Sequence, residues 1–238
     1  MCDCTPRKKL IHLYWLTTFA LFAAAIVRLV FYTPTEVTMG PIQKIFYLHL
    51  PVAIATGMAC MVTFIAGIGY LIKREMFWDD LSSAAARISV QLCAVVLLTG
   101  MIWGKSAWGQ WWTWSPRLTF SLILWLLYLV YLTVRMSIES KQRRAVISAV
   151  YAIIASLDVP LVWLSTKLMP DIHPQSIELA GSMKITLAMW FVPVFMMAAG
   201  LLIAKFKLNE RIRVAEIGTT AAFEPVMSAK FQYQGGVA

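Results

Sequence analysis

Charged residues are scarce in this sequence, and their scarcity excludes an ordinary water-soluble domain. Only 14% of the 238 residues are Asp, Glu, Lys or Arg, whereas 60% are hydrophobic and the mean hydropathy is +0.70. A soluble domain of this size needs more polar surface than that. The net charge of +9 is compatible with nucleic-acid binding. The cations are not interleaved with aromatics, however, so we assign the charge to loops beside membrane spans.

Cysteine and histidine are also rare. Cys2 and Cys4 precede the first apolar segment, and Cys60 and Cys93 lie inside later ones, so neither a disulfide framework nor a zinc site is predicted. The sequence has no Cys-x-x-Cys-His motif, which excludes a covalently attached c-type haem. It also shows no acid–base or nucleophile constellation, so its status as an enzyme is left open.

Long apolar runs take the place of these features. Each is near the length of roughly 20 residues that a helix needs to cross a bilayer. Helices are preferred because lipid offers no partners to backbone N–H and C=O groups. The sequence therefore predicts an all-α integral membrane protein with six transmembrane helices. The expected spans are residues 10–32, 45–72, 84–103, 118–136, 145–165 and 183–204.

The distribution of Lys and Arg predicts the orientation. With the N-terminus in the cytoplasm, most cations fall on the inner side, as the positive-inside rule requires. The outer side receives only Lys44, Lys105, Arg117, Lys167 and Lys184, with Arg28 in the outer half of the first span. We therefore predict both termini on the cytoplasmic side of a bacterial inner membrane. Residues 1–213 form the membrane domain, and 214–238 form a polar, disordered cytoplasmic tail.

A run of tryptophans occupies the outer connection between the third and fourth spans. The stretch WGKSAWGQWWTWSPRLT covers residues 103–119 and contains Trp103, Trp108, Trp111, Trp112 and Trp114. The i, i+3, i+4 spacing of Trp108, Trp111 and Trp112 predicts a short surface helix with these rings on one face. Such rings form either a platform for a large planar ligand or an anchoring aromatic belt.

The end of that stretch predicts the start of the fourth span. Ser is a good N-cap and Pro is favoured at the first helical position, so the helix begins at Pro116 with Ser115 as its cap. Arg117 then lies at the outer mouth, where it either pairs with an anion or extends to the membrane interface.

Two of the three histidines fall on the same side as the tryptophans. His49 lies at the outer end of the second span and His173 in the last outer loop, whereas His12 lies at the cytoplasmic start of the first span. Taken singly, each is a satisfied polar residue. Together they suggest a haem held by two imidazoles between aromatic walls. A zinc site would need a third ligand, and none is visible.

At this point the sequence resembles a known family. WGKSAWGQWWTWSPRLT is similar to the tryptophan-rich "WWD" signature of haem-handling proteins in cytochrome c biogenesis, and in particular to the CcmC haem-delivery family of the system I pathway. The resemblance implies that haem b is bound transiently at the outer membrane face and passed to the periplasmic haem chaperone CcmE. It also implies association with an ABC-type complex of CcmA and CcmB and with the small membrane protein CcmD.

The resemblance assigns roles to particular residues. It makes His49 and His173 the axial haem ligands and Trp108, Trp111, Trp112 and Trp114 the haem-facing platform, to which Trp103 is added. Arg117 is the best candidate for a haem propionate, with Lys44, Lys105 and Lys184 as lesser ones. The sequence departs from the family at Ser115, where the family has Asp, and at 167–172, before the second histidine.

Three other readings remain. A haem transporter or channel would need polar groups at membrane depth, and Asp158 in the fifth span is the one acid there. A cytochrome c haem lyase or synthetase would carry larger outer domains or additional membrane histidines. A purely structural subunit would use the tryptophans only as anchors.

Overall fold

Every regular element of the described chain is a helix. The computed structural model describes residues 5–169, 172–173 and 178–234. Across these ranges no strand forms, and one isolated bridge joins Glu36 to Gly40. The helices in chain order are α1 (Thr5–Val27), the π-helix η1 (Arg28–Tyr32), the 3-10 helix η2 (Pro41–Ile45), α2 (Phe46–Lys73), α3 (Met76–Trp108), α4 (Pro116–Met136), α5 (Lys141–Ser156), α6 (Asp158–Leu168) and α7 (Gly181–Gln234).

Six helical segments within the described ranges are long and apolar enough to cross a membrane, which confirms the predicted number of spans. The third is longer than expected, because α3 begins at Met76 rather than at residue 84. Asp79 and Asp80 made that first part look like a loop. In the structure they lie inside the helix, where Arg135 and Arg213 pair with their carboxylates.

The fifth span consists of two helices rather than one. α5 ends at Ser156 and α6 begins at Asp158, with Leu157 between them. Pro160 explains the break, since it has no N–H to donate to the carbonyl of Ser156. Asp158 thus lies in the first turn of α6.

The segment after Val214 is not the disordered tail that the sequence predicts. α7 continues as a helix to Gln234, and the prediction for residues 235–238 lies outside the described residues. Each residue added to an existing helix gains a backbone hydrogen bond, so a long helix extends readily through residues of ordinary propensity.

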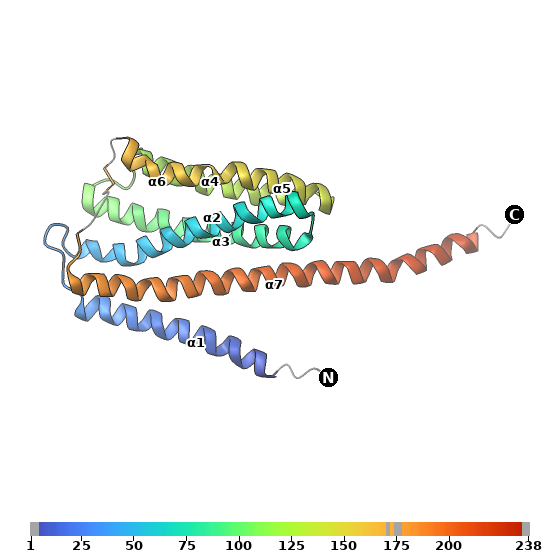
Figure 1. Cartoon of the computed structure of the whole chain (residues 1–238), viewed down its shortest axis with the longest axis horizontal. Coiled ribbons are helices and arrows are strands. Elements are labelled where there is room, and N and C mark those ends of the chain that lie inside the picture. The colour runs from blue at the N-terminus through green and yellow to red at the C-terminus, as the bar shows by residue number, and fades with distance from the viewer. Residues whose placement is uncertain (1–4, 170–171, 174–177, 235–238) are drawn as a thin grey trace.

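The helices pack around the central pair α2 and α3 (Figure 1). α4, α5 and α6 cover one side of this pair, and α7 covers the other side and carries α1 on its outer face. One buried cluster fills the space between α1, α2 and α7 around Tyr47 and Trp190. A second fills the space between α2, α3, α4 and α5 around Cys60, Tyr128 and Tyr131.

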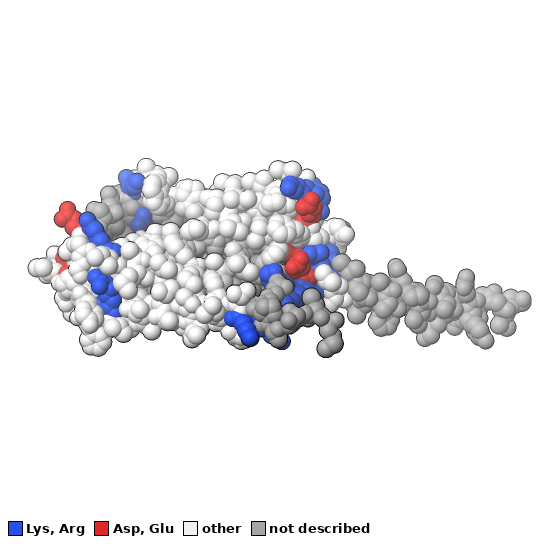
Figure 2. All heavy atoms as spheres, turned by 60° about the horizontal axis from the view of Figure 1, so that its bottom comes forward, with Lys and Arg blue, Asp and Glu red and all other residues white. Residues whose placement is uncertain are grey.

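The bundle has two distinct ends. The tryptophan end contains the α1–α2, α3–α4 and α6–α7 connections, and the terminal end lies opposite, on the side of both chain termini (Figure 1). Figure 2 shows the charged side chains gathered at these two ends, with an uncharged band between them. This arrangement suits a bilayer, whose core excludes unpaired charge.

Ion pairs fasten the terminal end. The Arg135 guanidinium meets Asp79 with two hydrogen bonds, of 2.5 and 2.9 Å, and so joins α4 to α3. Arg213 donates to the Asp80 carboxylate over 2.7 Å and joins α7 to α3. The polar contacts at this end hold helices together, whereas those at the tryptophan end surround the candidate site.

Candidate functional site

His49 is held at the tryptophan end by a hydrogen bond between two helices. It is the fourth residue of α2, and its Nδ1 lies 2.8 Å from the hydroxyl of Thr99 on α3. The Thr99 hydroxyl also lies 2.7 Å from the carbonyl oxygen of Val95 in its own helix. The imidazole is partly buried and has a fixed neighbour on one of its two nitrogens.

Trp103 brings the two outer histidines together. Its ring centroid lies 6.1 Å from that of His49 and 6.3 Å from that of His173, in both cases edge to face. Trp103 is only 4% exposed and also meets the ring of Phe46. The structure thus places His49 and His173 against one indole, although more than 120 residues separate them in the sequence. His12 lies near the start of α1, at the terminal end.

Arg117 lies beside His173. Its Nη1 is 3.5 Å from His173 Nδ1, and its Nη2 donates to the carbonyl oxygen of Trp163 over 3.1 Å. Arg117 is the second residue of α4, while Trp163 belongs to α6, so the guanidinium bridges two helices above the buried tryptophan. The cation that the sequence predicted to meet an anion therefore lies next to a predicted iron ligand.

The five tryptophans do not form one helical face, and the predicted surface helix across Trp108, Trp111 and Trp112 is wrong. α3 ends at Trp108, because Gly109 adopts φ +75° and donates its N–H to the carbonyl of Lys105. This left-handed conformation suits glycine and stops the helix. Trp111 and Trp112 follow in an irregular turn, so their spacing no longer matches a helical repeat.

The tryptophan side chains instead lie at different depths. Trp103 is buried, and Trp108 packs over Gly104, where an added Cβ would meet the indole at 3.4 Å. Trp112 is partly buried and contacts the ring of Trp114 edge to face at 5.9 Å. Trp111 and Trp114 are 56% and 76% exposed. The run of tryptophans therefore extends from the buried histidine contact to the surface.

The start of α4 agrees with the sequence in position but not in its capping contact. The helix begins at Pro116 with Ser115 at the N-cap, as predicted. The Ser115 side chain, however, makes no capping hydrogen bond, and Thr119 donates instead to the Ser115 backbone carbonyl. The fixed φ of Pro116 is compatible with the helix start without a side-chain cap.

Several buried polar atoms around this turn have no hydrogen-bond partner among the described residues. Buried polar groups are almost always hydrogen-bonded, so these groups are available to a bound ligand. All of these groups can donate an N–H or O–H to an acceptor such as a carboxylate. The atoms are Trp103 Nε1, Trp112 Nε1, Thr113 Oγ1, Ser115 Oγ and Thr119 Oγ1.

The other outer cations have local partners. Lys44 donates to the carbonyl of Leu29 and Lys105 to that of Gly109, each over 3.0 Å. Arg28 faces the bundle interior, where its Nε donates to the Thr186 hydroxyl on α7. Arg117 therefore remains the best placed of the predicted cations for a ligand at Trp103, because its contacts include His173.

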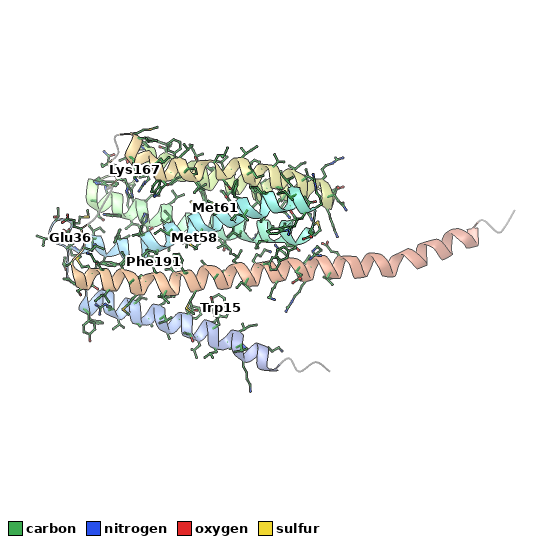
Figure 3. All side chains as sticks on the ribbon, in the orientation of Figure 1. Trp15, Glu36, Met58, Met61, Lys167 and Phe191 are labelled. Carbon is green, nitrogen blue, oxygen red and sulfur yellow. The ribbon has the colours of Figure 1, made fainter. Side chains whose placement is uncertain are left out.

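The rim of this end also carries groups that the sequence did not single out. Lys167, labelled in Figure 3, lies 4.0 Å above the ring of Trp163. Glu36, also labelled in Figure 3, accepts the N–H of Met39, which holds the pKa of its carboxyl below the usual range. Thr99 is the most important omission. It lies four residues before Trp103 and so on the same face of α3. This spacing is visible in the sequence and could have indicated Thr99.

The donor set fits a haem iron better than a structural zinc. Neutral imidazole is a common axial ligand of haem iron, and both candidates lie against a buried aromatic ring. Over the described ranges, no group of three or more His, Cys, Asp or Glu side chains gathers as a zinc site would require. The unpartnered groups and Arg117 can donate hydrogen bonds to the carboxylates of a porphyrin.

The chain is similar to known proteins of one family. The family model described as "Heme exporter protein C" matches residues 4–221. The protein of that name from Rhodobacter capsulatus is 34% identical over 127 residues, which is 53% of this chain and 52% of that protein. That from Bradyrhizobium diazoefficiens is 30% identical over 166 residues, or 69% and 63%.

The Escherichia coli protein of the same name is 28% identical over 153 residues, which is 63% of this chain and 62% of that protein. The matched part of the chain thus spans about half the length of the Rhodobacter relative and less than two thirds of the other two.

Proposed function

The chain belongs to the heme exporter protein C family, and on this premise we propose that it binds haem b and delivers it during cytochrome c maturation. The recipient is the periplasmic haem chaperone CcmE, and the protein works beside the ABC-type subunits CcmA and CcmB and a CcmD-like small membrane protein. The observation that carries the proposal is the single buried indole of Trp103, which contacts both His49 and His173.

The residues divide the task of holding haem. His49 and His173 supply the two axial nitrogens, and the Trp103 indole is the aromatic wall that both imidazoles contact. Arg117 and the unpartnered donors of Trp112, Thr113, Ser115 and Thr119 hydrogen-bond the propionates. Charge-assisted hydrogen bonds to carboxylates are strong and directional. Trp108, Trp111, Trp112 and Trp114 extend this apolar site toward the surface, where the chaperone docks.

The tryptophan end faces the periplasm in this proposal, and both termini lie in the cytoplasm. Support comes from the charges: most Lys and Arg residues belong to helix ends and connections at the terminal end, and cations accumulate on the cytoplasmic side of inner-membrane proteins. A chaperone in the periplasm then meets the exposed rings of Trp111 and Trp114 directly.

A transfer assay tests delivery separately from binding. Haem-loaded protein, purified with its partners, is mixed with the soluble domain of the chaperone, and transfer is followed by absorbance. We expect Trp114→Ala to keep its haem spectrum but to slow transfer several-fold, because it removes exposed aromatic surface at the point of contact.

Trp163→Ala is the matched control for that assay. It removes another exposed tryptophan at the same end, one that contacts Lys167 instead of the turn. Transfer should stay near the wild-type rate in this variant. If both variants slow transfer equally, or neither does, the tryptophans of the turn serve as an anchoring belt rather than a delivery surface.

A further inference from the structure

An imidazole can bind iron through only one of its nitrogens, and the hydrogen bond at the other nitrogen decides which one. For His49 the partner is the Thr99 hydroxyl, 2.8 Å from Nδ1. That contact alone leaves two possibilities, because a hydroxyl can donate or accept. The surroundings of Thr99 distinguish between them.

The Thr99 hydroxyl carries one hydrogen and has two kinds of neighbour. Its oxygen lies 2.7 Å from the carbonyl oxygen of Val95 and 3.1 Å from that of Val96. A carbonyl oxygen can only accept, so the hydroxyl hydrogen points to these carbonyls. Toward His49, Thr99 then offers a lone pair, and Nδ1 must carry the hydrogen.

We propose that Thr99 is a positioning residue that fixes neutral His49 as the Nδ1–H tautomer and so leaves the Nε2 lone pair for the ligand. The part that concerns iron rests on the proposed function. The tautomer itself does not, since it follows from the hydrogen bonds of the protein alone. A hydrogen-bond partner on the other ring nitrogen orients a metal-binding imidazole and adjusts its basicity.

The same face of α3 restrains the ring in other directions. An added Cβ at Gly100 would lie 3.5 Å from His49 Cε1, so the α3 backbone passes close to that edge of the imidazole. Trp103, one turn after Thr99, meets the ring edge to face. Thr99, Gly100 and Trp103 therefore together restrain the His49 ring. The ring cannot flip without losing the threonine hydrogen bond.

The first test uses haem-free protein in detergent and needs no activity. Nitrogen-15 NMR of labelled histidine distinguishes the two neutral tautomers, and His49→Ala identifies the signal. Wild-type His49 should be Nδ1–H. Thr99→Val removes the acceptor at nearly constant shape and should move His49 toward Nε2–H, the form that histidine prefers in water. Thr99→Ser keeps the hydroxyl and should restore Nδ1–H.

Thr63→Val is the matched control. Thr63 is buried in α2, and its hydroxyl donates to the Ala59 carbonyl as that of Thr99 does to Val95, but no histidine contacts it in the described structure. The variant should leave the His49 tautomer unchanged. A wild-type His49 found as Nε2–H overturns the proposal, even if every variant misfolds, and so does a Thr99→Val protein that keeps Nδ1–H.

The second test uses haem-loaded protein. Loss of such a partner typically lowers metal affinity about 10- to 100-fold, so Thr99→Val should weaken haem binding by about tenfold and shift the iron reduction potential. Thr99→Ser and Thr63→Val should remain close to wild type. If the tautomer is as proposed but wild-type protein binds no haem, the proposed function fails while the role of Thr99 stands. If haem binds but the tautomer is Nε2–H, the proposed function stands while the role of Thr99 fails.

Discussion

The residue that most directly links the site to an anionic ligand is Arg117. Its guanidinium is shared between His173 and the carbonyl of Trp163, at the beginning of α4. A guanidinium has five N–H donors and cannot lose its charge under ordinary conditions, so it can add a carboxylate to these contacts. In the proposed site, Arg117 would thereby link the binding of a propionate to the position of His173.

Arg117→Gln should weaken haem binding by about 10- to 100-fold, since a hydrogen bond to a charged group contributes about 1.5–3 kcal/mol. Titration of detergent-solubilised apoprotein with haem measures this change. Arg28→Gln is the control, because it removes an arginine at the same end whose hydrogen bond to Thr186 joins η1 to α7. An Arg117→Gln protein with wild-type affinity would show that Arg117 only braces α4 against α6.

At this scale the sequence proposed the candidate residues but not their contacts. His49 and His173 could be selected because both histidines fall beside the same aromatic stretch once the spans are drawn. Thr99 could not be selected with the same certainty, since a threonine in an apolar helix usually bonds its own backbone. Only the rotation of α3 against α2 shows that its hydroxyl also meets His49.

At the scale of elements, the α3–α4 turn determines how the site is built. Gly109 ends α3 with a left-handed residue, and Pro116 starts α4, so the six residues between them follow no regular repeat. The spacing of the tryptophans suggested a helix. Spacing alone cannot show that α3 has already ended at Gly109, before Trp111 and Trp112. α3 thus places Trp103 against both histidines, whereas the turn exposes Trp111 and Trp114.

The cap of α4 gives a prediction for that turn. Ser115 makes no side-chain cap hydrogen bond, so Ser115→Ala should change the unfolding free energy by less than about 0.5 kcal/mol, below the usual loss of a cap. Thermal unfolding in detergent measures the difference. Ser140→Ala is the comparison, because the Ser140 side chain does accept the Arg143 N–H at the start of α5. A larger loss at Ser115 than at Ser140 would contradict this account of the turn.

At the scale of the whole molecule, the apolar runs predicted six spans because helix length and composition follow directly from the thickness of a bilayer. They did not predict the break at Leu157 or the length of α7, since neither interrupts an apolar run. The packing order of the helices was also beyond the sequence. It is this order that sets α2, α3, α4 and the α6–α7 connection around one buried indole.

The central claim is that His49 and His173 together form one haem site, and an absorption spectrum tests it most directly. Wild-type protein purified with haem should show the Soret and α/β bands of low-spin, bis-imidazole iron. We expect these bands to be lost or strongly weakened in His49→Ala and in His173→Ala. His12→Ala, which removes the third histidine at the opposite end, should leave them intact. If both site variants keep the wild-type bands, these two histidines are not the ligands.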